Sequence, residues 1–104
     1  MSEIFISCVT EGELRYGVER IPEATKLRAL VESFLLDVTI LPWDSAAAKQ
    51  YGFLRAELEA TGRAMGNLDT MIGAHALALG AVLVTNDGAF SRIADLKVVD
   101  WTKK

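Results

Sequence analysis

Three acidic side chains, Glu13, Asp69 and Asp87, occupy positions at which a parallel α/β fold would gather them. Glu13 follows the first expected strand, Asp87 follows a later apolar strand, and Asp69 begins a helix between them. Sites in open parallel sheets collect at the C-terminal ends of the strands. Carboxylate oxygens suit Mg²⁺ or Mn²⁺, and such a cation can position water for attack on a phosphodiester. The three acids therefore predict a divalent-metal site that hydrolyses phosphodiester bonds.

Each acid also has a purely structural interpretation, which the residues alone leave open. Glu13 lies three residues after Thr10, at the spacing of a capping box. Asp69 suits a helix N-terminus, where a negative charge is favourable, and Asp87 suits a tight turn.

The first half of the chain predicts a strand and two helices. Residues 4–9 are rich in Ile, Phe and Val, the composition of a strand, after which Thr10 can cap a helix. We expect that helix to be short, since Gly17 weakens its end and Pro22 restricts the residue before it. A second helix is expected from residues 22–24, because apolar residues then recur at three- and four-residue steps as far as Val38.

The rest of the chain continues the alternation. A short strand is expected at residues 39–41, and Asp44 is expected to cap a helix that ends by Gly62. A further helix is predicted over residues 68–79, with Gly80 at its C-terminal end. Residues 81–84 (AVLV) have the pattern of a strand covered on both faces, and a helical turn at 90–93 and a strand at 97–99 follow. This alternation predicts an α/β fold with a mainly parallel sheet.

Length and charge narrow the class of protein. At 104 residues the chain is expected to be one domain, residues 1–104. Its net charge of −3 argues against a protein that holds nucleic acid mainly by a broad basic surface. With one cysteine, no leader pattern and no long apolar run, we expect a cytoplasmic protein without a membrane role.

Four other kinds of residue are weighed against the acids. His75 lies about 600° round the helix from Asp69, so a packing role is favoured over catalysis. Cys8 is expected to be a small buried residue. Thr85 and Asn86 could orient a metal-bound water, or could simply stabilise their turn. The arginines at positions 15, 55 and 63 are interpreted as solvated helix faces rather than as an RNA-binding stripe.

Three ordered motifs together resemble a known family. They are residues 13–17 (ELRYG), 69–76 (DTMIGAHA) and 84–90 (VTNDGAF), and the tail over residues 92–101 fits the same pattern. The whole is similar to the VapC-type PIN-domain toxins, and the likeness covers nearly the entire chain.

The resemblance implies a three-layer α/β/α PIN-like fold and a Mg²⁺- or Mn²⁺-dependent endoribonuclease, with transfer RNA among its expected substrates. It also implies a homodimer and a VapB-type antitoxin partner. Glu13, Asp69 and Asp87 fall on the family's acidic positions, both as metal ligands and as catalytic residues.

One departure from the family concerns the opening strand, which usually carries an aspartate. The sequence before residue 4 does not supply it, and Glu3 precedes a strand that the family places second. The expectation is therefore a PIN-like domain that is incomplete at its N-terminus. Two alternatives stay open: a shortened protein that acts only through dimerisation or antitoxin binding, and an unrelated α/β signalling module whose acids only cap elements.

Overall fold

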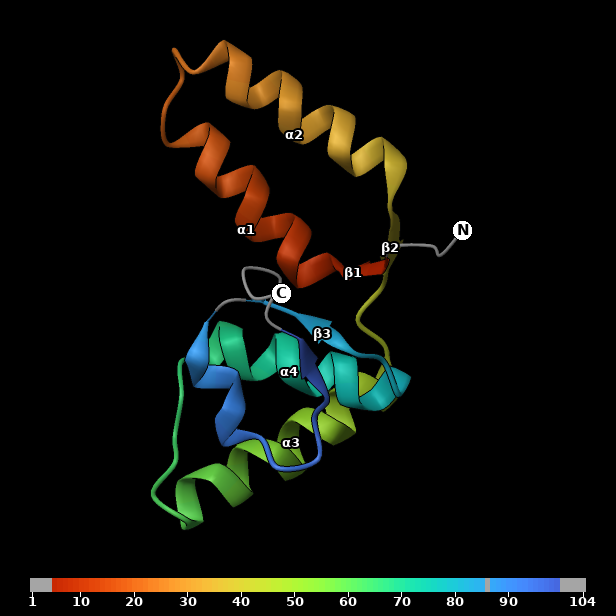
Figure 1. Cartoon of the computed structure of the whole chain (residues 1–104), viewed down its shortest axis with the longest axis vertical. Helices are drawn as coiled ribbons and strands as arrows, with labels where there is room; N and C mark the ends of the chain where they lie inside the picture. The colour runs from red at the N-terminus through yellow and green to blue at the C-terminus, as the bar shows by residue number, and fades with distance from the viewer. Residues whose placement is uncertain (1–4, 86, 100–104) are drawn as a thin grey trace. The chain divides into compact units, whose positions relative to one another are not determined.

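The computed structural model describes residues 5–85 and 87–99, and it divides into two compact units, residues 1–43 and 44–104. Along the chain, strands alternate with helices as predicted (Figure 1). Both strand pairs are parallel, in two sheets of two strands each, which confirms the predicted parallel pairing.

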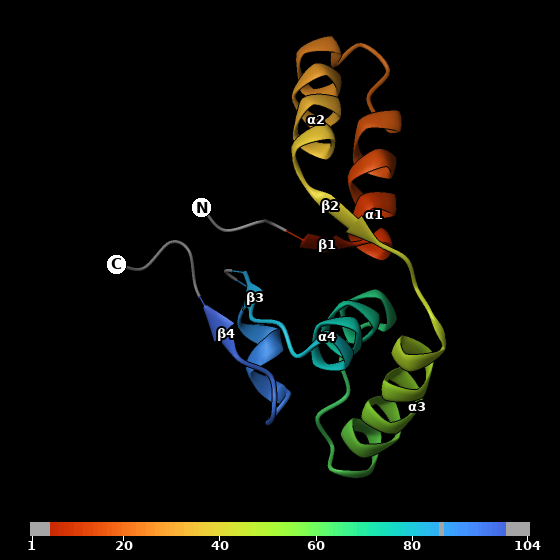
Figure 2. The same ribbon diagram turned by 90° about the vertical axis from the view of Figure 1, so that its right-hand side faces the viewer.

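The first unit is a helical hairpin with a small sheet at one end. Its elements are β1 (Phe5–Ser7), α1 (Cys8–Glu19), α2 (Thr25–Asp37) and β2 (Thr39–Leu41). The two helices run side by side in opposite directions (Figures 1 and 2). In the sheet, Phe5 is opposite Thr39 and Ser7 is opposite Leu41, so the predicted strand at residues 39–41 is confirmed.

Charge pairs and two buried side chains join α1 to α2. Arg15 donates to Glu11 on its own helix at 2.8 Å and to Glu32 on α2 at 3.2 Å. Val18 and Leu35 are buried, with 4% and 7% of their surface exposed. The ion pairs are exposed and therefore weak, so apolar packing supplies most of the contact energy.

Several expectations for this unit were wrong by a few residues. The N-cap of α1 is Ser7, whose Oγ accepts from the Val9 amide at 3.0 Å, and Thr10 lies inside the helix. Pairing of β1 ends at Ser7, which leaves the chain helical from Cys8 onward. Cys8 is therefore partly exposed at the start of the helix rather than buried.

The two helix boundaries near Pro22 also differ from the prediction. α1 continues past Gly17 to Glu19, because burial of Val18 outweighs the roughly 1 kcal/mol that a glycine costs a helix. α2 begins at Thr25, since residues 21–24 form a turn in which the Ala24 amide donates to the Ile21 carbonyl at 3.0 Å.

The second unit packs two helices against a short sheet. Its elements are α3 (Ser45–Ala60), α4 (Asn67–Leu79), β3 (Leu83–Val84), the 3-10 helix η1 (Gly88–Arg92) and β4 (Val98–Val99). α4 lies between α3 on one side and the β3–β4 pair with η1 on the other (Figure 2). As predicted, Asp44 Oδ1 caps α3 by accepting from the Ala47 amide at 2.9 Å, and Gly80 ends α4 with a φ of 64°.

The core of this unit forms on both sides of α4. Its buried members come from α3, α4, η1 and the turn after η1, and they are Leu54, Leu58, Ala74, Ala76, Phe90, Ile93 and Leu96. Gly73 lies where α4 meets η1: a Cβ at this position would stand 2.5 Å from Ile93 Cδ1. A side chain larger than hydrogen is therefore not accommodated there without movement of a core residue.

The strand expected at residues 81–84 is shorter and less covered than predicted. Only Leu83 and Val84 are paired, and Val82 and Val84 are 50% and 59% exposed, whereas Leu83 packs against the core. Successive side chains of a strand point to opposite faces, and within this unit α4 and η1 cover only one of them. In the described part of the chain, no helix is long and apolar enough to cross a membrane.

The close approach at Gly73 leads to a stability prediction. Gly73→Val should lower the free energy of unfolding by about 1–3 kcal/mol, the range for an overpacked core, because its methyl groups would meet Ile93. Gly52→Val is the matched control, since Gly52 lies in α3 with nothing within 4 Å of an added Cβ. Urea unfolding of both variants measures the difference, and equal stabilities would contradict the packing described at Gly73.

Candidate functional site

Asp69 lies in the first turn of α4 and is partly buried. The helix begins at its N-cap Gly66, whose carbonyl accepts the Thr70 amide at 2.9 Å and the Thr70 hydroxyl at 2.8 Å. Thr70 is only 2% exposed, so the residue beside Asp69 is anchored in the interior. These contacts fix the backbone that presents the Asp69 carboxylate.

Asp87 follows β3 and is the N-cap of η1. Its Oδ1 accepts from the Ala89 amide at 2.9 Å, and its own amide donates to Thr85 Oγ1 at 3.1 Å. Asp87 is exposed, but these two bonds orient it at the end of the strand. The prediction that Asp87 stabilises a turn is therefore confirmed, and this role is compatible with a second role for the carboxylate.

The two aspartates are close enough to influence each other's charge. Burial raises the pKa of the Asp69 carboxyl above its ordinary value, and the negative charge of Asp87 raises that pKa further. The position of Asp69 near a helix N-terminus acts in the opposite direction, since the helix dipole favours an anion there. The net rise means that the folded chain holds Asp69 where its negative charge is disfavoured.

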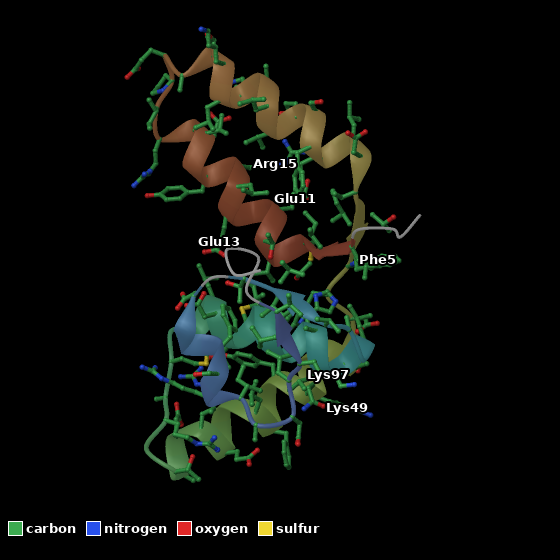
Figure 3. All side chains as sticks on the ribbon, viewed as in Figure 1. Phe5, Glu11, Glu13, Arg15, Lys49 and Lys97 are labelled. Carbon is green, nitrogen blue, oxygen red and sulfur yellow. The ribbon has the colours of Figure 1, made fainter. Side chains whose placement is uncertain are left out.

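Glu13 lies in the other unit, on α1, and is exposed. Glu11 and Arg15 lie on the side of α1 that faces α2, where Arg15 donates to Glu32, and Glu13 lies on the opposite side (Figure 3). The ion pairs of the hairpin therefore do not involve the face that carries Glu13. Glu13 belongs to a different compact unit from Asp69 and Asp87, so the prediction that it joins them stays a prediction.

The acidic pair fits a divalent cation in its chemistry. Its oxygens are the hard ligands that Mg²⁺ and Mn²⁺ prefer, and a bound cation would offset both the burial and the repulsion that raise the pKa of Asp69. Among residues 5–85 and 87–99, no group of three or more His, Cys, Asp or Glu side chains is arranged to hold a metal ion. Within the second unit, then, the pair is the part of the predicted site that is brought together.

The other candidate residues have contacts that agree with structural roles. His75 is buried with 2% of its surface exposed, which agrees with a packing role. Thr85 accepts the Asp87 amide and so stabilises the turn, whereas Asn86 lies outside the described residues. Arg15 and Arg55 pair with glutamates on the helix surface, as the interpretation as solvated faces predicts.

Comparison with known proteins gives a consistent result. The model of the PIN domain family matches residues 1–96. The chain is 40% identical over 98 residues to the tRNA(fMet)-specific endonuclease VapC of Shigella flexneri, covering 93% of this chain and 74% of that protein.

Two solved structures have the same fold. The VapBC2 complex of Rickettsia felis, bound to a DNA fragment from its promoter, matches with a TM-score of 0.89 at 36% identity, covering 95% of this chain and 75% of that one. The DNA-bound VapBC complex of Salmonella typhimurium matches with a TM-score of 0.88 at 39% identity, covering 93% and 74%. These matches confirm the predicted PIN-like α/β fold.

The raised pKa of Asp69 predicts that its charge opposes folding. A carboxyl whose pKa is higher in the folded chain is penalised above that pKa, and the penalty disappears as acid protonates it. Asp69→Asn should therefore raise the Tm at pH 7, by an amount that shrinks toward zero below about pH 4, the ordinary range of the unfolded carboxyl. Thermal unfolding followed by circular dichroism at several pH values measures this.

A matched control is Asp95→Asn, which removes an exposed carboxylate from the turn before β4. It should leave the Tm at pH 7 nearly unchanged. A Tm at pH 7 that is lower in Asp69→Asn than in the parent would contradict the electrostatic description of the pair.

Proposed function

This chain belongs to the PIN-domain family of VapC-type toxins, and we propose that it is a divalent-metal-dependent endoribonuclease of a toxin–antitoxin pair. The reaction is hydrolysis of RNA phosphodiester bonds, and transfer RNA is the substrate class that the names of its relatives suggest. The observation that carries the proposal is the placement of two carboxylates, Asp69 at the start of α4 and Asp87 at the end of β3. Burial, and after it the negative charge of Asp87, raises the pKa of Asp69.

In this proposal Asp69 and Asp87 hold Mg²⁺ or Mn²⁺ together with Glu13, within one PIN-like domain that includes both units. When bound, the cation supplies charge stabilisation at the phosphodiester and a more acidic attacking water. Asp69 contributes a charge that folding has placed in an unfavourable position, so it gains more from a cation than a solvated carboxylate would. This gain makes Asp69 the strongest candidate ligand.

The roles of the other two acids follow from how each is held. The Ala89 amide binds Asp87 Oδ1 at 2.9 Å and thereby keeps this carboxylate in one orientation. A ligand held in place before the cation arrives loses little conformational freedom on binding. Glu13 lies away from the ion pairs of the α1–α2 hairpin, which leaves its charge for the cation or for orienting the attacking water.

We propose that RNA binds mainly through the metal site rather than through a basic surface. The net charge is −3, and several arginines donate to acids or carbonyl groups of the chain itself. Proteins that bind nucleic acid by charge alone need several free cationic contacts with phosphates. A cation held by the acids would offset the repulsion between the negatively charged chain and RNA, so substrate binding should depend on the metal as well.

The partners in the proposal are a VapB-type antitoxin and a second copy of this chain. Large apolar side chains on the helical hairpin are exposed, among them Tyr16 at 66%, Leu30 at 69% and Leu36 at 86%. Exposed apolar side chains of this size are typical of positions that another chain covers. We assign this surface to the toxin–antitoxin complex.

Loss of the Asp69 charge tests the nuclease directly. Asp69→Asn should abolish Mg²⁺- or Mn²⁺-dependent cleavage of a transfer RNA transcript, a loss of at least about 100-fold, because the amide keeps the shape of the side chain but not the charge that holds a hard cation. Cleavage is followed by denaturing electrophoresis, and circular dichroism should show an unchanged fold.

The control variant is again Asp95→Asn, which should cut at the parental rate. Chelation by EDTA should stop the parent, and an excess of Mn²⁺ should restore it. If Asp69→Asn cuts RNA as well as the parent does, the cation is held elsewhere. A parent that never cuts, yet still binds antitoxin, would support the alternative of a binding-only protein.

A further inference from the structure

Two arginines form a reciprocal pair of hydrogen bonds between the segments that carry the acidic pair. Arg63 Nη1 donates to the Arg92 carbonyl at 2.6 Å, and Arg92 Nη1 donates to the Ala64 carbonyl at 3.1 Å. The bonds join the loop before α4 to the last residue of η1. We propose that Arg63 and Arg92 are positioning residues, which set the separation of the Asp69 and Asp87 carboxylates.

The Arg92 bond reaches Asp69 through a short, well-anchored stretch of backbone. Ala64, which accepts it, lies two residues before Gly66, the N-cap of α4. The Gly66 carbonyl in turn accepts both the amide and the hydroxyl of Thr70, which is buried next to Asp69. A shift of the loop at Ala64 would therefore move the first turn of α4 and its carboxylate.

The Arg63 bond reaches Asp87 through η1. Asp87 caps this helix by accepting from Ala89, and Ser91 Oγ donates to the Gly88 carbonyl at 2.7 Å. The bonds tie successive residues between Asp87 and Arg92 into one short element. Its last carbonyl is the group that Arg63 holds, so the end opposite Asp87 is fixed to the loop before α4.

The surroundings of Arg63 argue against a primary role in binding RNA phosphate. Its Nε donates to Thr61 Oγ1 at 2.9 Å, and its Nη2 lies 4.0 Å from Glu57 Oε2. Together with the bond to Arg92, these contacts engage all three nitrogens of the guanidinium with groups of the chain itself. A phosphate would have to displace them, whereas a positioning role uses them as they stand.

The consequence concerns metal affinity, and in this respect the inference rests on the proposed function. Removing a group that orients a metal ligand without contacting the metal typically changes metal affinity or activity by about 10–100-fold. The arginines donate to backbone carbonyls rather than to the acids, so their effect should appear as a looser acidic pair. The folded core, formed by α3, α4 and η1, should persist without them.

The experiment uses Arg63→Met and Arg92→Met, which keep an unbranched apolar stem and remove the donors. The matched control is Arg55→Met, because the hydrogen bonds of Arg55 in the described part of the chain go to Glu59 and Tyr51 within α3. Three quantities are measured: hydrogen exchange of the Thr70 and Ala89 amides in metal-free protein, binding of Mn²⁺ followed by electron paramagnetic resonance, and the KM for RNA at several salt concentrations.

Each of the two variants should speed exchange at both amides, since each bond of the pair supports both segments. Each should also weaken Mn²⁺ binding by about tenfold, whereas Arg55→Met should match the parent. Arg63→Lys, which can still donate to the Arg92 carbonyl, should recover most of the affinity. Recovery in Arg63→Lys would indicate that loss of the hydrogen bond, rather than a change in side-chain volume, weakens Mn²⁺ binding in Arg63→Met.

Three results would overturn the inference. Unchanged exchange at both amides would show that the bonds do not hold the segments, and altered exchange with parental Mn²⁺ affinity would make the arginines structural only. A raised KM for RNA that depends on salt, with Mn²⁺ affinity intact, would instead assign them to phosphate contacts. If the parent protein binds no Mn²⁺, the proposed function itself is contradicted. If the parent binds Mn²⁺ and the variants bind it equally tightly, only the inference about the arginines fails.

Discussion

Burial of the Asp69 carboxylate, together with the negative charge of Asp87, raises the pKa of Asp69 and so costs folding free energy that the packing of α4 must offset. α4 is packed on both sides, by α3 and by η1, and Gly73 allows the close approach on the η1 side. Thr70 anchors the helix start, and Ala89 orients Asp87. These contacts fix the backbone at Asp69 and the side chain of Asp87.

The first unit contributes to function in a different way. Ion pairs between α1 and α2 involve Arg15 and Arg28, whereas Glu13 lies on the other side of α1. The same hairpin exposes Leu30 and Leu36, so one small element presents both an acid and an apolar surface. The proposed assignment of Glu13 to the metal site and of the exposed apolar side chains to a partner requires such a separation of faces.

Short-range sequence signals predicted the helices and strands well. Contacts between residues distant in sequence explain where the observed boundaries and burial differ from the prediction. Asp44 and Gly80 were correctly identified as helix ends, because a capping carboxylate and a left-handed glycine act within one turn of the chain. Ser7 and Thr10 are both good caps, and only the pairing of β1 with β2 selects Ser7. The extent to which β3 is covered likewise depends on partners distant in sequence.

The same distinction applies to the site. The types and order of Glu13, Asp69 and Asp87 indicated the chemistry, and the resemblance to a family made that indication specific. The proximity of Asp69 and Asp87 could not be deduced from spacing, since it depends on how η1 packs against α4. Arg63 was interpreted as a solvated side chain, because nothing in its sequence neighbourhood indicates a bond to a carbonyl 29 residues away.

Anomalous scattering from Mn²⁺ in crystals of the chain tests the central claim most directly, because it locates the cation without reference to activity. The account predicts one Mn²⁺ within direct coordination distance, about 2.0–2.6 Å, of carboxylate oxygens of both Asp69 and Asp87, with Glu13 completing the acidic site. Mn²⁺ bound elsewhere, with Asp69 and Asp87 left without metal at saturating concentration, would contradict it.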